Sequence, residues 1–493
     1  MEQTVVDGVP VYWAEGPAPM TATLAFGVGT RDESFRTIGV THLIEHLAMS
    51  ALPRVHYEHN ASVELETTQF FATGKPAQLV EFLDVVCRAL ADLPLDRVEK
   101  EAGVLAAEGS QVTHPTAAAL LARRFGTSGY GLAPWAGPGY DRIPAEAVAA
   151  HARRYFTKGN AVLTLTGPPP EGLRLALPDG ERPARVAQEP LPADGPRWSA
   201  ENVPCPGLSL TGPSASAPWN IAMLVLQERL TTTARREKGI SYDVGGERAD
   251  VSPETTERLI WLDAREGREA EVAEILWNTA QRLADDGPDQ EEVDHELAAF
   301  AELIDDPRLV VARLDLRARA ELLGGPYYTD EDWLVELKAV TPEQVAAVMA
   351  EGLRTALLVV PEGVALDLSD RDGAPVAVGG CARVIGPEPD GRVLRPPLAA
   401  RVLNGAARRV RLILGTDGVT LRDDDGDLHT IRFADVVGVE VQDGARTVFG
   451  RHGCVIPVDP DLFRGAEAAV AALDAAVDPA LRYRTSDLVS RDE

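Results

Sequence analysis

The chain has 493 residues, of which 45% are hydrophobic and 25% charged, and its formal net charge is −28. This length exceeds what one hydrophobic core supports, so we expect about two to four domains, and the acidity disfavours nucleic acid or an anionic membrane as a partner. No apolar run reaches the roughly 18 residues that cross a bilayer, and the N-terminus lacks a signal-peptide pattern, so we expect a cytoplasmic protein without a transmembrane segment.

Two proline-rich stretches, at about 181–207 and 361–397, divide the sequence. Proline disrupts central strands and helix interiors, so we interpret both stretches as linkers. Three domains follow from this division, at 1–180, 205–362 and 398–493.

The first domain mixes strand and helix patterns. Apolar alternation predicts strands at 8–13, 21–28 and 61–72. Residues 40–52 have a helical pattern, and residues 79–90 repeat apolar side chains at the spacing of an amphipathic helix. This mixture indicates an α+β layer fold.

The first two domains share a faint internal repeat. A helix pattern at 143–150 leads into the apolar strand 161–165. In the second domain, a helix pattern at 341–347 leads in the same way into the strand 356–360. This match suggests two copies of one α+β domain.

The third domain has a different pattern, of short strands separated by Asp-Gly turns. The strand candidates are 409–414, 419–422, 429–433, 437–441 and 448–449. A helix at about 466–477 closes the domain. From the strand count and this helix, the domain resembles a small pleckstrin-homology (PH)-like barrel, a fold that by itself assigns no ligand.

The segment 42–46 reads H-L-I-E-H and carries the strongest chemical signal. In a helix, residues four apart lie on one face, so His42 and His46 can bind one metal ion. Glu45 lies beside that face and can take a proton from a water that the metal activates. Paired helix histidines also occur as ordinary polar surface, so the motif alone leaves both interpretations open.

Two histidines leave a zinc site incomplete, so another element must supply the third ligand. A helix that we expect to begin after Asp96, as its N-cap, and to run to about residue 112 carries Glu101 and Glu108. The two glutamates are seven residues apart and lie near the same face. Glu108 is the better ligand candidate and Glu101 the better supporting partner, but this spacing does not separate the two roles.

Several ordered motifs resemble those of the pitrilysin-type (M16, inverzincin) family of zinc metallopeptidases. They are the segment 29–33 (G-T-R-D-E), Gly39, the H-x-x-E-H segment, Asn60-Ala61, the Glu101 and Glu108 pair, and the segment 236–242 (R-E-K-G-I-S-Y). The resemblance implies two homologous α/β sandwich domains and Zn²⁺ as the cofactor. It also implies that Glu108 is the third zinc ligand and that Glu101 lies behind the ligands.

The same resemblance implies a zinc-dependent endopeptidase that cleaves unstructured peptides or leader segments, with Glu45 as general base. The predicted strand at 61–72 becomes an edge on which an extended peptide pairs, near Asn60 and Ala61. Arg236 and Tyr242 are implied to hold the substrate carbonyl and stabilise the oxyanion. Without the resemblance, these two residues are an ordinary surface arginine and a tyrosine at the start of a strand.

The sequence departs from the family in two ways. The segment between His46 and Asn60 is shorter than usual, which leaves substrate selection open. Family enzymes enclose the substrate between four such domains, and this chain supplies two, which implies a homodimer or a heterodimer with a related subunit. The alternatives are a catalytically silent scaffold or peptide-binding subunit, and an adaptor whose C-terminal domain recruits a partner. The presence of His42, Glu45, His46 and Glu108 favours an enzyme.

Overall fold

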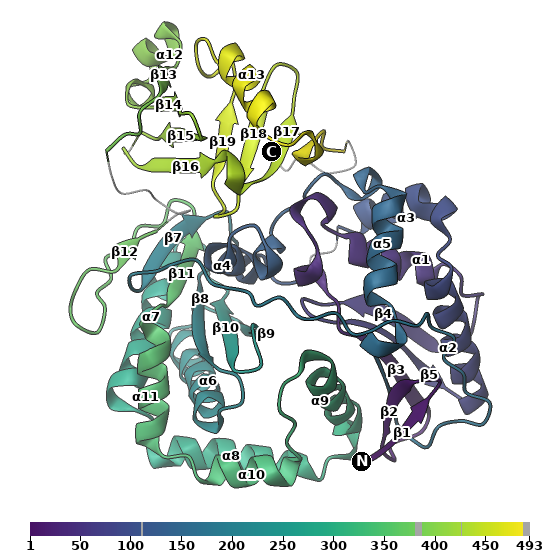
Figure 1. Ribbon diagram of the computed structural model, residues 1–493. Helices are drawn as coiled ribbons and strands as arrows, with labels where there is room; N and C mark the ends of the chain where they lie inside the picture. Colours follow the sequence, from purple (N-terminus) through teal and green to yellow (C-terminus); the bar gives the residue numbers. More distant parts are fainter. Residues whose placement is uncertain (110–111, 380–386, 425, 487–493) are drawn as a thin grey trace.

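Two six-stranded sheets form the body of the molecule, and two four-stranded sheets form its C-terminal part (Figure 1). This architecture comes from a computed structural model that describes residues 1–109, 112–379, 387–424 and 426–486. Within these ranges, no helix combines the length and the apolar character that crossing a bilayer requires.

The first sheet has the strand order β1-β2-β6-β3-β5-β4. Its strands are β1 (Glu2–Val6), β2 (Val9–Trp13), β3 (Met20–Phe26), β4 (Glu58–Val63), β5 (Thr68–Gly74) and β6 (Ala161–Leu165). The helices α1 (Val40–Met49), α2 (Pro76–Ala91), α3 (Val98–Glu108) and α5 (Ala145–Tyr155) pack with it around one core. Phe26, Phe70 and Phe82 are fully buried in that core, which is the mixed α/β arrangement expected from the sequence.

The second sheet has the order β12-β7-β11-β8-β10-β9. Its strands are β7 (Arg197–Glu201), β8 (Gly207–Pro213), β9 (Val244–Asp250), β10 (Thr255–Leu262), β11 (Leu357–Pro361) and β12 (Ala377–Val378). Its helices are α6 (Ala217–Leu230), α7 (Glu269–Asp286), α8 (Gln290–Ile304), α10 (Asp330–Lys338) and α11 (Pro342–Leu353), and the π-helix η7 (Thr231–Glu237) extends α6. From β2 to β4 and from β7 to β9, the order and direction of the strands agree. The two sheets therefore share the topology of these five strands, which agrees with the predicted internal repeat.

One helix of each half lies on the sheet of the other half (Figure 1). Helix α4 (Pro115–Phe125) packs on β8, β10 and β11, where Leu120 and Leu121 are buried among side chains of the second sheet. Helix α9 (Val310–Leu323) packs on β2, β3 and β6, where Leu314 and Ala318 are buried. One face of each sheet is thus covered by a helix that belongs to the other half.

Three sequence predictions differ from the structure in the first two domains. The predicted strand 61–72 is two strands, β4 and β5, because the chain turns between them and pairs back on itself. Asp96 lies in a 3-10 turn, and α3 begins after it with Arg97 as the N-cap. Strand β7 lies before the expected domain start at 205, since Pro196 and Pro204 flank the strand instead of interrupting it.

The C-terminal region contains two sheets around a shared core. One comprises β13 (Arg392–Leu394), β14 (Arg411–Leu414), β15 (Gly418–Arg422) and β16 (Leu428–Arg432), and the other β17 (Val436–Val441), β18 (Arg446–Gly450), β19 (Val455–Val458) and β20 (Arg482–Tyr483). The helices are α12 (Leu398–Leu403) and α13 (Glu467–Ala476). The closing helix is confirmed, but neither sheet closes into a barrel within the described residues, because each keeps two unpaired edge strands. The PH-like assignment remains a prediction.

The C-terminal region docks on the loop that leads into α1. Phe35 in this loop is buried among Trp135, Phe449 and Tyr483, with ring centroids 5.9, 5.0 and 6.4 Å away. The Thr127 hydroxyl also donates a hydrogen bond to the carbonyl of Gly450, at 3.1 Å. The third region therefore contributes directly to the position of the loop before α1.

Candidate metal centre

Helix α1 begins at a turn that requires glycine. Gly39 has a φ of 87°, and a Cβ at this position would collide with the Tyr140 ring. The carboxylate of Glu33 accepts hydrogen bonds from the N–H groups of Gly39 and Thr41, at 2.7 and 2.9 Å. An acceptor and a negative charge at a helix N-terminus stabilise the first turn. Burial raises the pKa of Glu33 to about 7, although the two donors oppose the shift.

The inner face of α1 fixes which side chains point outward. Leu43, Ile44 and Leu47 are fully buried in the core of the first half. The hydroxyl of Thr41 lies 3.1 Å from Nε2 of His151 on α5, which ties the two helices together. These contacts leave His42 and His46, four residues apart, on one outward-facing side of the helix.

His42, His46 and Glu108 come together where α1 meets α3. Their ligand atoms all lie within 4.8 Å of one another, and His46 Nε2 is 3.3 Å from Glu108 Oε2. Ligand atoms on one tetrahedral zinc ion, with bonds of about 2.0–2.2 Å, are about 3.3 Å apart. Two imidazoles and one carboxylate also form the donor set of catalytic zinc sites that keep one position open. The residues present therefore fit a zinc ion.

Glu45 lies against both histidines. Its Oε2 atom is 3.6 Å from Nε2 of His42 and 3.8 Å from Nε2 of His46. Burial, and then the charge of Glu108, raises the pKa of Glu45 to about 8. Burial, and then the neighbouring His46, lowers the pKa of His42 to about 4, although Glu108 opposes the shift. At neutral pH the His42 imidazole is therefore neutral, which is the form that binds metal ions.

The structure separates the two glutamates of α3. Glu108 faces Nε2 of His46, whereas Glu101 Oε2 lies 3.9 Å from Nδ1, on the other side of the ring. This second distance is too long for a hydrogen bond, so Glu101 acts on the ring as a neighbouring charge. Arg97 holds Glu101 in turn through an ion pair of 2.9 Å.

Strand β4, which carries Asn60 and Ala61, forms the edge of the first sheet. Asn60 pairs with Phe71 and Ala61 with Phe70 on β5, and β4 has no strand on its other side within the described residues. Helix α1 packs against β4. An unpaired strand edge therefore lies next to the histidine-bearing helix, and its backbone groups can accept a further strand.

Arg236 and Tyr242 are not brought to the histidine cluster. The Arg236 guanidinium pairs with Glu228 at 2.6 Å, within the second half. Tyr242 is 74% exposed, its ring lies under the guanidinium of Arg235, and its N–H donates to Asp263 at 2.7 Å. These contacts of Arg236 and Tyr242 all lie within the second half. Their catalytic role remains a prediction.

Sequence reasoning did not assign a role to Glu33. Glu33 belongs to the segment 29–33 that resembles the family. Its contact with the start of α1 forms only because the loop between Glu33 and Gly39 folds back. The available signal was an acidic residue a few positions before a glycine that opens a helix. This signal is weak, because acidic loop residues are common.

No protein-family model and no curated protein matches the chain. Solved structures do match its fold. A peptidase M16 inactive domain from Pseudomonas fluorescens has a TM-score of 0.60 and 17% identity, over 77% of this chain and 99% of that chain. A protease from Helicobacter pylori has a TM-score of 0.56 and 15% identity, over 73% of this chain and 99% of that chain.

The chain has the fold of the M16 peptidases. The periplasmic protease PqqL from Escherichia coli matches with a TM-score of 0.58 and 14% identity, over 90% of this chain and 56% of that chain. At these identities the likeness concerns the fold alone. Because one similar chain is described as an inactive domain, the M16 fold by itself does not establish catalysis.

Proposed function

We propose that the chain is a zinc-dependent endopeptidase that cleaves unstructured peptides or leader segments. His42, His46 and Glu108 hold the zinc ion, and Glu45 is the general base. The observation that carries this proposal is the cluster itself, in which three ligand atoms lie within 4.8 Å and Glu45 Oε2 lies beside both imidazoles. A constellation of ligands plus an adjacent buried carboxylate supports metal-assisted hydrolysis.

Zinc supplies Lewis acidity, which polarises a carbonyl oxygen and makes water a stronger acid. Glu45 accepts the proton of the attacking water and returns it to the leaving amine. Its pKa of about 8 without metal falls when a cation lies nearby, so the carboxylate form is available at neutral pH. Glu101 and Arg97 keep the His46 ring in place from behind.

The substrate pairs in extended form with the free edge of β4, beside Asn60 and Ala61. Backbone pairing gives affinity with little sequence demand, which suits unstructured peptides. Arg236 and Tyr242 face solvent and are available to hold the substrate carbonyl once a second chain, either another copy or a related subunit, encloses the peptide.

The test is metal content and peptide cleavage measured on the same preparations. We expect about one zinc per chain in the wild type and in Glu45→Gln, and little in His46→Ala. Cleavage of an unstructured reporter peptide should fall by about a hundredfold or more in Glu45→Gln, because the base is lost while the metal stays. Wild-type protein that binds no zinc after reconstitution, or that cleaves no better than Glu45→Gln, would overturn the proposal.

A catalytically silent, peptide-binding subunit is the second candidate function. It is favoured by the structural match, over 77% of this chain and 99% of that chain, to a chain described as an inactive domain. Peptide cleavage distinguishes the two candidates. A silent subunit binds an unstructured peptide at β4 without cleaving it, whether or not it contains zinc.

A further inference from the structure

A cavity of about 710 Å³ lies between the two halves of the chain, and none of the metal-centre residues lines it. It is bounded by the β4–β5 turn, the N-terminal end of α6, strands β9 and β10, and the helices α8, α9 and α10. Its volume falls in the range of about 300–1,000 Å³ that is typical of small-molecule sites.

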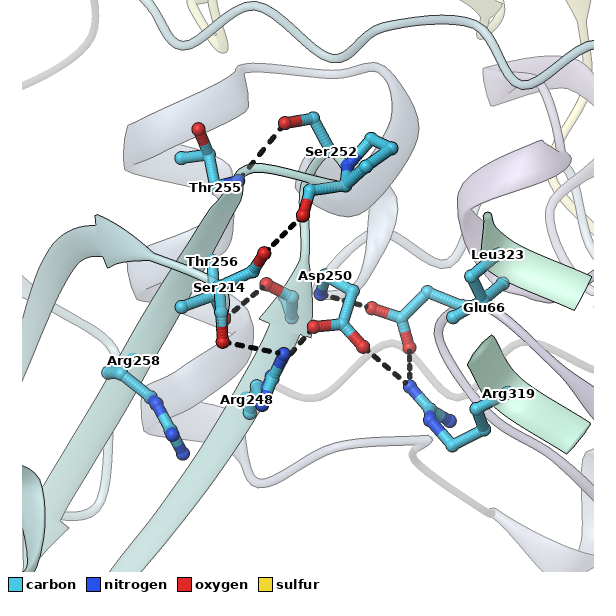
Figure 2. A network of polar contacts seen from close by, with 12 residues as sticks. Glu66, Ser214, Arg248, Asp250, Ser252, Thr255, Thr256, Arg258, Arg319 and Leu323 are labelled. Atoms are coloured by element: carbon cyan, nitrogen blue, oxygen red, sulfur yellow. Dashed lines mark hydrogen bonds and ion pairs between the residues drawn. The ribbon is translucent and has the colours of Figure 1, made fainter. Parts of the chain in front are cut away.

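Most charged groups on one wall of the cavity are mutually neutralised (Figure 2). Arg319 on α9 pairs with Glu66 at 3.0 Å and with Asp250 at 3.3 Å, and Arg248 pairs with Asp250 at 2.6 Å. Glu66 also accepts the N–H of Asp250 at 2.7 Å. Although burial opposes it, the charges of Arg248 and Arg319 lower the pKa of Asp250. This carboxylate is therefore ionised and already shared by two arginines.

Arg258 also lines the cavity, and no ion pair joins it to a carboxylate within the described residues. It lies directly opposite Arg248 in the β9–β10 register, and like charges in this position repel. Its Nε atom is buried without a hydrogen-bond partner in the described residues, and its guanidinium donates to Asn220 Oδ1 at 3.3 Å. Figure 2 shows it without a link to any carboxylate drawn. Burial, and then the Arg248 charge, lowers the pKa of Arg258 to about 10, so it remains a cation at neutral pH.

Another part of the cavity lining is apolar and incompletely covered. Leu316 on α9 is 60% exposed, and Tyr328 is 40% exposed with its ring centroid 5.4 Å from that of Trp333. The cavity lining therefore combines a cation that has no carboxylate partner with uncovered aromatic and aliphatic surface. This combination of an apolar body and one fixed polar group is characteristic of sites for amphipathic small molecules.

We propose that this cavity binds a small organic anion. A carboxylate or phosphate group pairs with the guanidinium of Arg258, and an aromatic or aliphatic body packs on Leu316, Tyr328 and Trp333. Arginine presents a planar set of donors that matches both anions, and the only partner of the Arg258 terminal nitrogens within the described residues is Asn220. The proposal does not depend on the proposed peptidase activity, because it concerns other residues and binding alone.

The test is calorimetric titration of the full chain with three probes of similar body. The probes are N-acetylphenylalanine, phenyl phosphate and the neutral N-acetylphenylalaninamide. We expect at least one anionic probe to bind the wild type, and the amide to bind at least about tenfold more weakly. The stronger of the two anionic probes distinguishes a carboxylate site from a phosphate site.

Two variants and a control locate the binding. Arg258→Gln should weaken the anionic probe about tenfold or more, whereas Arg354→Gln, at an exposed arginine outside the cavity, should not change it. Leu316→Asp places a negative charge on the exposed apolar wall and should also weaken binding, which keeps the test decisive if Arg258→Gln does not fold. The proposal is overturned if neither anion binds the wild type, if the amide binds equally well, or if a folded variant of either wall binds like the wild type.

Discussion

The first α-helix after the fourth strand in the sheet order, β3 in the first half and β8 in the second, serves different purposes in the two halves. In the first half this helix is α1, which turns His42 and His46 outward. In the second half it is α6, which buries Trp219, Ile221 and Leu226 and contains no histidine. Five strands of the two sheets share order and direction, so the same position in one fold can carry a metal centre or only a core. The difference lies in the side chains and not in the topology.

The two helices also begin differently. Helix α6 is capped locally, since the Ser216 side chain accepts the N–H of Trp219 at 3.3 Å. Helix α1 is capped by Glu33 from the preceding loop, and Phe35 in the same loop is held by the C-terminal region. The start of the metal-binding helix thus depends on contacts from a distant part of the chain.

The largest expected effect concerns the core helix. Trp219→Ala should lower the free energy of unfolding of the metal-free protein by about 3–5 kcal/mol, because the ring is buried against Gly212 and Gly352 and leaves a cavity. His46→Ala should change the same quantity by less than about 1 kcal/mol, since its side chain faces outward. Urea unfolding measures both. Equal losses would show that α1 is as much a core helix as α6.

The second prediction concerns the contact of helix α4 with the second sheet and its contribution to the free energy of unfolding. Glu257→Ala should cost about 3 kcal/mol, because it leaves the buried Arg124 of α4 without its carboxylate partner, 2.8 Å away. Glu201→Ala is the matched control, since it removes the more exposed partner of Arg123 on the same helix and should cost less. If both variants cost the same in thermal or urea unfolding, the burial of the Arg124 pair is not what joins α4 to the second sheet.

Glu45 predicts a pH-dependent difference with no counterpart in α6. Its pKa is raised from 4.5 to about 8, so the folded metal-free protein binds a proton that the unfolded chain releases above pH 4.5. The stability this proton provides is complete below pH 4.5 and is lost as the pH rises towards 8. The glutamine side chain of the Glu45→Gln variant does not titrate, so this variant does not lose this stability. In the metal-free proteins, the free energy of unfolding of Glu45→Gln relative to that of the wild type should therefore rise by roughly 2 kcal/mol between pH 5 and pH 7. A constant difference across this range would contradict the buried position of Glu45.

The smallest effect distinguishes the two caps. Glu33→Ala and Ser216→Ala should each lower the free energy of unfolding by about 1–2 kcal/mol, because each removes an acceptor at a helix N-terminus. Only Glu33→Ala should also weaken zinc binding, since His42 lies in the first turn of α1. Competition with a zinc chelator measures this affinity, and an unchanged value would show that the cap of α1 does not position His42.

The sequence anticipated elements whose evidence is local. Apolar periodicity predicted α2, and the matched helix–strand pairs predicted a repeat with which the shared strand order of the two sheets agrees. Predictions were less accurate where partners are distant. The place of β7 in the second sheet depends on pairing with β11, far away in the chain. The division of 61–72 has a local cause, because β4 and β5 form a hairpin whose short turn the strand pattern did not reveal.

The same division holds at the candidate metal centre. The sequence by itself determined that His42 and His46 share one face of a helix with Glu45 beside them, because a spacing of four is set by helical geometry. Only the tertiary structure decided which ring nitrogen of His46 each glutamate of α3 faces, since that depends on how α3 packs against α1. Tertiary packing also decided the Glu33 cap, the exchange of α4 and α9, and the separation of Arg236 from the histidines. These features arise from contacts between elements, and no local spacing in the chain encodes them.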